Sequence, residues 1–78
     1  MSQIIVYSSN FCGSCEMVKG FLSLRNVEYI VKNVTTDIEG REELLALGFD
    51  STPVAVIGTQ VLPGFDTKAI DQALAAFD

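Results

Sequence analysis

The chain has 78 residues, of which 49% are apolar, and it carries a formal net charge of −5 at pH 7. A chain of this length forms one small domain with a limited core, so we expect a single domain over residues 1–78. The five basic residues are scattered along the chain, which argues against binding to nucleic acid or to an anionic membrane surface. No apolar run approaches the length of a membrane span, and residues 1–3 have no feature of a secretory signal. We therefore predict a cytoplasmic, reducing location.

Hydrophobic patterning predicts the first elements in chain order. Residues 3–7 form a short buried strand, and residues 8–10 form a loop. A helix begins near Cys12 and runs to about Arg25 despite an internal glycine. Residues 28–34, rich in β-branched and aromatic side chains, form the second strand. The apolar stripe of the first helix consists of Val18, Phe21 and Leu22, with Met17 and Leu24 at its margins.

Thr36 and Glu39 have the spacing of a capping box, in which each side chain accepts from the backbone N–H of the other residue. A second helix should therefore begin there. Gly48 suits the left-handed conformation that commonly ends a helix. The apolar side of this helix is expected from Leu44, Leu45 and Leu47.

The last third of the chain predicts a hairpin and a helix. Residues 54–57 and 60–62 flank Gly58 and Thr59, which fit a two-residue turn with glycine at its first central position. Asp66 or the threonine after it can cap a final helix. The buried face of that helix should contain Ile70, Ala73, Leu74 and Phe77.

Cys12 and Cys15 are the only cysteines, and they lie where the first strand gives way to the first helix. Two thiols at this spacing can close a small disulfide, and the unpaired N–H groups and partial positive charge of a helix N-terminus favour a thiolate. In a reducing compartment such a pair is more often catalytic than structural. Cys12, the outer cysteine, is the predicted nucleophile.

Structural roles for the two cysteines are weaker alternatives. A disulfide that closes so short a loop adds only about 2 kcal/mol on the chain-entropy model, so a stapling role is disfavoured. Structural zinc sites usually take four Cys or His ligands, and the chain has no histidine. These counts argue against a zinc site within one chain, while a metal shared between two chains stays open.

The element order, with Cys12 and Cys15 after the first strand, Pro53 before the third and residues 63–66 before the last helix, resembles the glutaredoxin branch of the thioredoxin fold. The resemblance covers nearly the whole chain. It implies an α/β fold of order βαβαββα, with a four-stranded mixed sheet and helices on both faces.

The resemblance also implies substrate-binding positions. The family proline that Pro53 matches is cis and lies beside the disulfide, where it exposes the backbone of Thr52 to a substrate chain. Gly64 matches a glycine where the backbone passes close to the active site. Phe65 and Asp66 match positions that contact the γ-glutamyl end of glutathione, although Asp66 is equally suited to capping the last helix.

Two basic residues fall at related positions. Arg41 lies near a family position that meets the glycine carboxylate of glutathione, and Lys19 lies one turn after Cys15, where a cation would support the thiolate. The alternative for both is an ordinary solvated charge on a helix.

Departures from the glutaredoxin pattern concern the electron donor. Gly13 and Ser14 replace the common Pro-Tyr, Ser8 replaces a frequent lysine, and Thr52 replaces the usual valine. Residues 48–54, together with Gly64 and Phe65 before the last helix, look closer to NrdH-type redoxins. Those proteins take electrons from thioredoxin reductase and pass them to ribonucleotide reductase. Apolar Leu62 and Phe65 near the active site are also expected to suit docking of a protein better than a charged peptide.

These patterns predict a dithiol-disulfide oxidoreductase in which Cys12 attacks and Cys15 resolves. No cofactor is expected to bind tightly, and glutathione is a candidate co-substrate. We expect a monomer that acts on disulfide-containing proteins, ribonucleotide reductase among them, with thioredoxin reductase or glutathione as donor. The alternatives are a glutathione-dependent iron-sulfur cluster carrier bridged between two chains and an interaction domain without redox activity.

Overall fold

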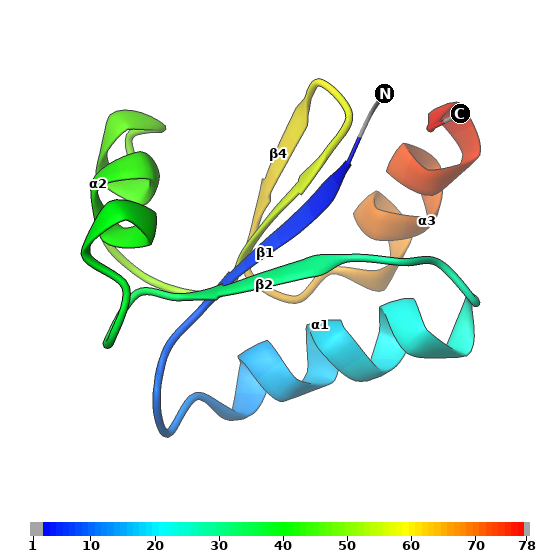
Figure 1. Ribbon diagram of the computed structural model, residues 1–78. Helices are drawn as coiled ribbons and strands as arrows, with labels where there is room; N and C mark the ends of the chain where they lie inside the picture. Colours follow the sequence, from blue (N-terminus) through cyan, green and yellow to red (C-terminus); the bar gives the residue numbers. More distant parts are fainter. Residues whose placement is uncertain (1–2, 78) are drawn as a thin grey trace.

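A computed structural model describes residues 3–77 of the chain (Figure 1). Its elements follow the expected order βαβαββα. They are β1 (Ile4–Ser8), α1 (Gly13–Leu24), β2 (Ile30–Asn33), α2 (Ile38–Ala46), β3 (Val54–Ile57), β4 (Gln60–Pro63) and α3 (Thr67–Ala76). Within the described residues, no helix is long and apolar enough to cross a membrane.

The four strands form one mixed sheet in the order β2-β1-β3-β4. β1 pairs with β2 in parallel and with β3 antiparallel, and the β3–β4 pair is antiparallel. Val6, at the centre of β1, lies opposite Val31 on one side and Ala55 on the other. The predicted four-stranded mixed sheet is confirmed.

Helices cover both faces of this sheet, as the resemblance implies (Figure 1). Successive side chains of a strand point to opposite faces, so Ile4 and Val6 meet one layer of helices while Tyr7 meets the other. The larger core contains side chains of β1 and β3 packed against α1 and α3. Its fully buried members are Ile4, Val6, Val18, Leu22, Ala55, Ile57, Ile70 and Ala73. The smaller core, on the α2 side, consists of Tyr7, Leu44 and Val54.

The predicted face of α1 is confirmed by Val18 and Leu22, both fully buried, and by Phe21, which packs against the same core. Beyond the helix end, Arg25 lies over the Phe21 ring at 4.6 Å and forms a 2.9 Å ion pair with Asp71 of α3. The ion pair links the C-terminal end of α1 to the middle of α3, the other helix on this face of the sheet.

The beginning of α2 differs from the prediction. Asp37 precedes the first helical residue and makes no capping bond with its side chain, so the capping box expected at Thr36 and Glu39 is wrong. The Thr36 and Asp37 backbone N–H groups both donate to the Asn33 carbonyl, at 3.2 and 2.8 Å. This turn directly after β2 places Thr36 outside the N-cap position.

Only one of the three leucines expected to face the core does so. Leu44 is 2% exposed, whereas Leu45 and Leu47 are 52% and 39% exposed. A nine-residue helix that packs on one face of the sheet buries a narrow stripe, and Leu44 occupies it. Gly48 follows with φ +94°, the left-handed conformation predicted for it.

A polar network ties α2 to the sheet. Tyr7 donates from its hydroxyl to Glu43 Oε1 at 3.0 Å, and Lys32 Nζ donates to the same oxygen at 2.6 Å. The hydrogen bond from Lys32, followed by that from Tyr7, lowers the pKa of Glu43. The hydrogen bond from Lys32 to Glu43 raises the pKa of Lys32. Burial, followed by the hydrogen bond from Tyr7 to Glu43, raises the pKa of Tyr7.

The remaining boundaries shift by one or two residues. Ser8, expected in a loop, is the buried last residue of β1, and β2 is shorter than predicted over residues 28–34. The hairpin is confirmed: Ile57 pairs with Gln60 across the turn, and Gly58 has φ +63°.

Candidate active site

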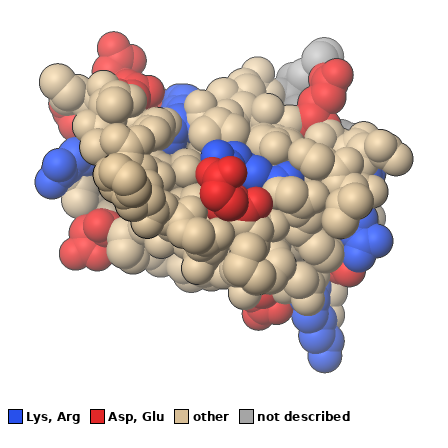
Figure 2. Space-filling view, turned by 90° about the horizontal axis from the view of Figure 1, so that it is seen from below, with Lys and Arg blue, Asp and Glu red and all other residues tan. Residues whose placement is uncertain are grey.

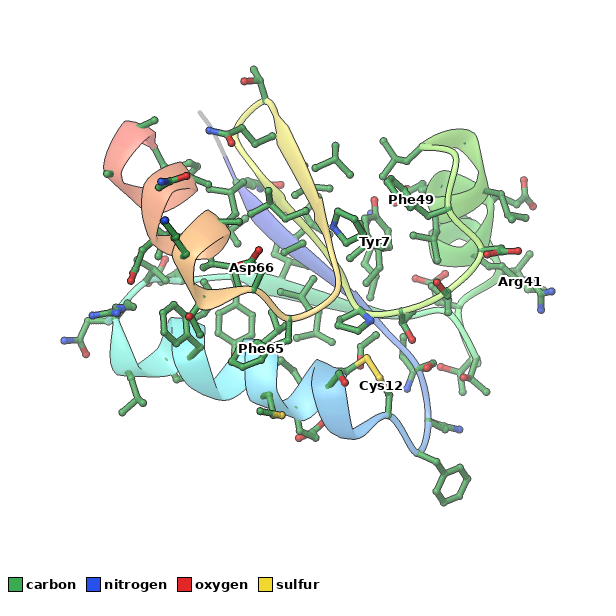
Figure 3. The ribbon with its side chains drawn as sticks, turned by 180° about the vertical axis from the view of Figure 1, so that it is seen from behind. Tyr7, Cys12, Arg41, Phe49, Phe65 and Asp66 are labelled. Atoms are coloured by element: carbon green, nitrogen blue, oxygen red, sulfur yellow. A yellow bond between two sulfur atoms is a disulfide. The ribbon has the colours of Figure 1, made fainter. Side chains whose placement is uncertain are left out.

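The two cysteines form a disulfide at the N-terminus of α1, and their exposure differs. Cys12 occupies the N-cap with extended backbone angles, and its Sγ accepts a 3.2 Å hydrogen bond from the backbone N–H of Cys15. Cys12 is partly exposed, while Cys15 is completely buried. Of the two cysteines, only the outer one can therefore meet a partner directly. Figure 3 shows their disulfide at the start of α1.

Thr52 and Pro53 lie against the outer cysteine. Their peptide bond is cis, as the resemblance implies, and the Thr52 hydroxyl donates to Cys12 Sγ at 3.7 Å. The backbone N–H of Gly64 donates to the Pro53 carbonyl at 2.8 Å, so the end of β4 is held beside the start of β3. Gly64 adopts φ +74°, a conformation that favours glycine. Thr52 thus contacts Cys12, and Gly64 holds the adjoining Pro53.

Phe65 and Leu62 contribute less apolar surface to the site than the sequence suggests. Both are half-buried and pack against the larger core. The Phe65 ring meets Phe21 of α1 edge to face, with centroids 6.1 Å apart. These two residues therefore offer less exposed apolar surface for docking a protein than the sequence suggests.

Asp66 caps α3. Its Oδ1 accepts from the backbone N–H groups of Lys68 and Ala69 at 3.1 and 3.2 Å, which confirms the capping prediction. Asp66 and Phe65 lie together in the segment that joins β4 to α3 (Figure 3).

The two basic candidates lie in different places. Lys19 lines an open cleft of about 430 Å³ together with Cys12, but its ammonium is ion-paired with Glu16 of the same helix. Arg41 projects from α2 away from Cys12 and lines a separate depression with Asp50 (Figure 3). The structure therefore does not bring Arg41 together with the cysteine pair.

The sequence did not identify two residues that lie near Cys12 in the structure. Phe11 is fully exposed, with φ +57°, directly before the nucleophile candidate. Ser9 places its Oγ 2.6 Å from the Thr52 hydroxyl oxygen. No sequence pattern signals the exposure of Phe11, since an aromatic residue beside a helix start is commonly buried. The Ser9 contact depends on the pairing of β1 with β3, which spans more than forty residues of sequence.

Charge is mixed on the face that α1 presents. Figure 2, which views this side, shows acidic and basic side chains scattered among uncharged ones, without a broad patch of one sign. Among residues 3–77, no group of three or more His, Cys, Asp or Glu side chains is placed to hold a metal ion. The described residues thus give no support to the cluster-carrier alternative.

Comparisons with known proteins agree with this geometry. Residues 4–62 match the family model described as Glutaredoxin. An uncharacterised glutaredoxin-like 8.6 kDa protein from the rubredoxin operon of Clostridium pasteurianum is 32% identical over 72 residues, covering 91% of this chain and 96% of its own.

Solved structures give the same result. The thioredoxin-like protein BC3987 superimposes with a TM-score of 0.87 at 36% identity, covering 91% of this chain and 99% of its own. The glutaredoxin-like NrdH-redoxin of Escherichia coli follows with a TM-score of 0.82 at 30% identity, covering 90% and 92%. The chain belongs to the glutaredoxin family of thiol-disulfide oxidoreductases and is similar to its NrdH-type redoxins.

Proposed function

We propose that this protein carries two electrons to disulfides of partner proteins, with Cys12 as nucleophile and Cys15 as resolving thiol. The observation that carries the proposal is the asymmetry of the pair. Cys12 is partly exposed at the N-cap of α1, where backbone N–H groups stabilise a thiolate, and Cys15 is fully buried behind it.

The reaction consists of two exchanges. The Cys12 thiolate attacks one sulfur of the substrate disulfide, the substrate S–S bond breaks, and the other substrate sulfur leaves as a thiolate that takes a proton from water. Cys15, having lost its proton to solvent, then attacks Cys12 Sγ and releases the second substrate thiolate. The substrate has gained two electrons, and the protein holds the Cys12–Cys15 disulfide present in the structure. A dithiol donor reverses these steps.

The surroundings of Cys12 suit an extended substrate chain. We assign the backbone of Thr52 to pairing with the segment that carries the substrate disulfide. Pro53 and Gly64 hold this backbone in place through the hydrogen bond from the Gly64 N–H to the Pro53 carbonyl. No bound cofactor is needed, because the two thiols carry both electrons.

For the electron donor we propose a protein, of the thioredoxin reductase type, rather than glutathione. Two side chains were expected to meet the charges of glutathione. Arg41 points away from the cysteines, and Asp66 already accepts two backbone hydrogen bonds through Oδ1 as the cap of α3. The fully exposed Phe11 beside Cys12 offers apolar surface that suits a protein better than a charged peptide. The E. coli relative is described as having a thioredoxin-like activity profile.

The proposed acceptor is a protein disulfide, and similarity to NrdH-type redoxins makes ribonucleotide reductase the first candidate. A monomer in a reducing compartment such as the cytoplasm suits this role, because the dithiol form must be regenerated between turnovers.

Disulfide turnover with NADPH tests the proposal. The rate at which a protein disulfide is reduced is measured with each of two donor systems: thioredoxin reductase from the same organism, and glutathione plus glutathione reductase. We expect saturable turnover with thioredoxin reductase, little with glutathione, and none with either donor for Cys12→Ser. Efficient, saturable turnover with glutathione and none with thioredoxin reductase would overturn the donor assignment.

A further inference from the structure

The Cys12 sulfur lies at the end of a chain of two hydroxyl groups. The Thr52 hydroxyl donates to Cys12 Sγ at 3.7 Å, and Ser9 Oγ lies 2.6 Å from the Thr52 oxygen. Ser9 directly follows β1 and Thr52 precedes β3. Because Tyr7 is paired with Val54, continuing this antiparallel register places Ser9 opposite Thr52. The strand pairing that builds the sheet therefore also aligns the two hydroxyls.

The direction of this chain follows from counting protons. A threonine hydroxyl has one proton, so when Thr52 donates it to Cys12 the short contact with Ser9 must be a bond from the Ser9 hydroxyl to the Thr52 oxygen. Each bond polarises the next, and the second hydroxyl makes the first a better donor. Ser9 thus reaches the sulfur only through Thr52.

The strength of the hydrogen bond from Thr52 to Cys12 changes with the redox state of the cysteines. In the disulfide, Cys12 Sγ is a weak, neutral acceptor, whereas in the reduced protein a thiolate at the same position carries a full negative charge. The Thr52 bond therefore stabilises the thiolate more than it stabilises the disulfide. It adds to the bond that the Cys15 N–H already donates to the same sulfur at 3.2 Å.

Other charged groups near Cys12 compensate one another. The charged side chains that line its cleft are Glu16 and Lys19, and these two are ion-paired with each other. Their opposite charges partly cancel at the sulfur, which leaves uncharged donors as the main local source of stabilisation beside the helix terminus.

We propose that Ser9 and Thr52 form a hydroxyl relay that stabilises the Cys12 thiolate, with Thr52 in direct contact and Ser9 as a positioning residue acting through it. This inference rests on the proposed role of Cys12 as nucleophile. It gives the side chain of Thr52 a role separate from the substrate pairing assigned to its backbone.

The test measures the alkylation rate of each cysteine in the fully reduced protein over a range of pH, by peptide mass spectrometry after short exposure to iodoacetamide. Thr52→Val removes the hydroxyl with little change of shape and should slow Cys12 alkylation near pH 6 by about threefold to tenfold. The difference should disappear at high pH, where the thiol is fully ionised in every variant.

The combination of variants identifies the relay. Ser9→Ala should slow the reaction by about twofold in the wild-type background and have no effect in the Thr52→Val background. Thr52→Ser keeps the hydroxyl and should retain the wild-type rate. Thr59→Val, the same change at the exposed hairpin turn, should have no effect.

Two results would overturn the relay: a wild-type alkylation profile for Thr52→Val, or equal slowing by Ser9→Ala in both backgrounds. Urea unfolding of each variant establishes that it is folded, and if Thr52→Val does not fold, a wild-type profile for Ser9→Ala overturns the relay by itself. Faster alkylation of Cys15 than of Cys12 in the wild-type protein is a different failure, because it contradicts the proposed function.

Discussion

Phe11 and Phe65, two aromatic residues close to the active site, differ in how far their side chains are exposed. Phe65 is half-buried and packs edge to face on Phe21, while Phe11 is fully exposed. Their contributions to stability should differ for this reason.

We expect Phe65→Ala to lower the free energy of unfolding by about 2 kcal/mol, because removal of the ring leaves a gap between α1 and the segment before α3. Phe11→Ala serves as the matched control and should change it by less than about 0.5 kcal/mol. Urea unfolding followed by circular dichroism measures both. Equal losses for the two variants would contradict the packing described for them.

Asp66 has a measurable role in the stability of α3. Its carboxylate accepts from two backbone N–H groups of the first turn, so Asp66→Ala should lower the free energy of unfolding by about 1 kcal/mol. Asp66→Asn keeps an oxygen in the same position and should retain most of the stability. Thermal unfolding of the three proteins decides the matter, and an Asp66→Ala variant as stable as wild type would rule out the capping role.

At the scale of elements, α2 is joined to the sheet by one polar network and one buried leucine. Glu43 accepts from Tyr7 and Lys32, and the pKa of Glu43 is lowered, first by the bond from Lys32 and then by that from Tyr7. A carboxylate whose pKa falls on folding stabilises the folded state above its unfolded pKa, and that contribution disappears as pH falls through the folded pKa.

The stability difference between wild type and Glu43→Gln should therefore be largest near neutral pH. It should shrink as the pH is lowered below 4.5, the ordinary value for this group. Urea unfolding at several pH values gives the measurement, and Glu42→Gln, at the exposed neighbouring position, is the control. A Glu43→Gln deficit that stays constant down to pH 3 would show that the charge is not the cause.

Elements with strong periodic patterns were predictable, and those decided by local competition were not. The stripe of α1 and the face of α3 follow from spacing that places one row of apolar side chains inward. The start of α2 could not be predicted, because Asn33 competes for the same turn. Its carbonyl accepts from the N–H groups of Thr36 and Asp37, and its side-chain oxygen accepts from the Thr35 N–H. The capping-box spacing contains no information about that competition.

At the scale of the whole molecule, the sheet order follows from the element order together with the family resemblance. The cysteines, Pro53 and Gly64 were predicted to lie together. The structure places their segments at one end of the sheet, because β1 and β4 end there and β3 begins there. The position of Arg41 apart from Cys12 could not be predicted, because it depends on how α2 lies across the sheet, which sequence spacing does not determine. The contact between Ser9 and Thr52 likewise becomes visible only when the register of β1 and β3 is known.

The most direct test of the central claim is to trap the first exchange. Reduced Cys15→Ser protein is mixed with a peptide disulfide, and the adduct is located by mass spectrometry of proteolytic fragments. The exposed Cys12 should accumulate as a stable mixed disulfide, because the thiol that would release the peptide is missing. Reduced Cys12→Ser should form little adduct, since Cys15 is fully buried. A Cys15 adduct that forms as fast in Cys12→Ser as the Cys12 adduct does in Cys15→Ser would contradict the assignment of nucleophile and resolving thiol.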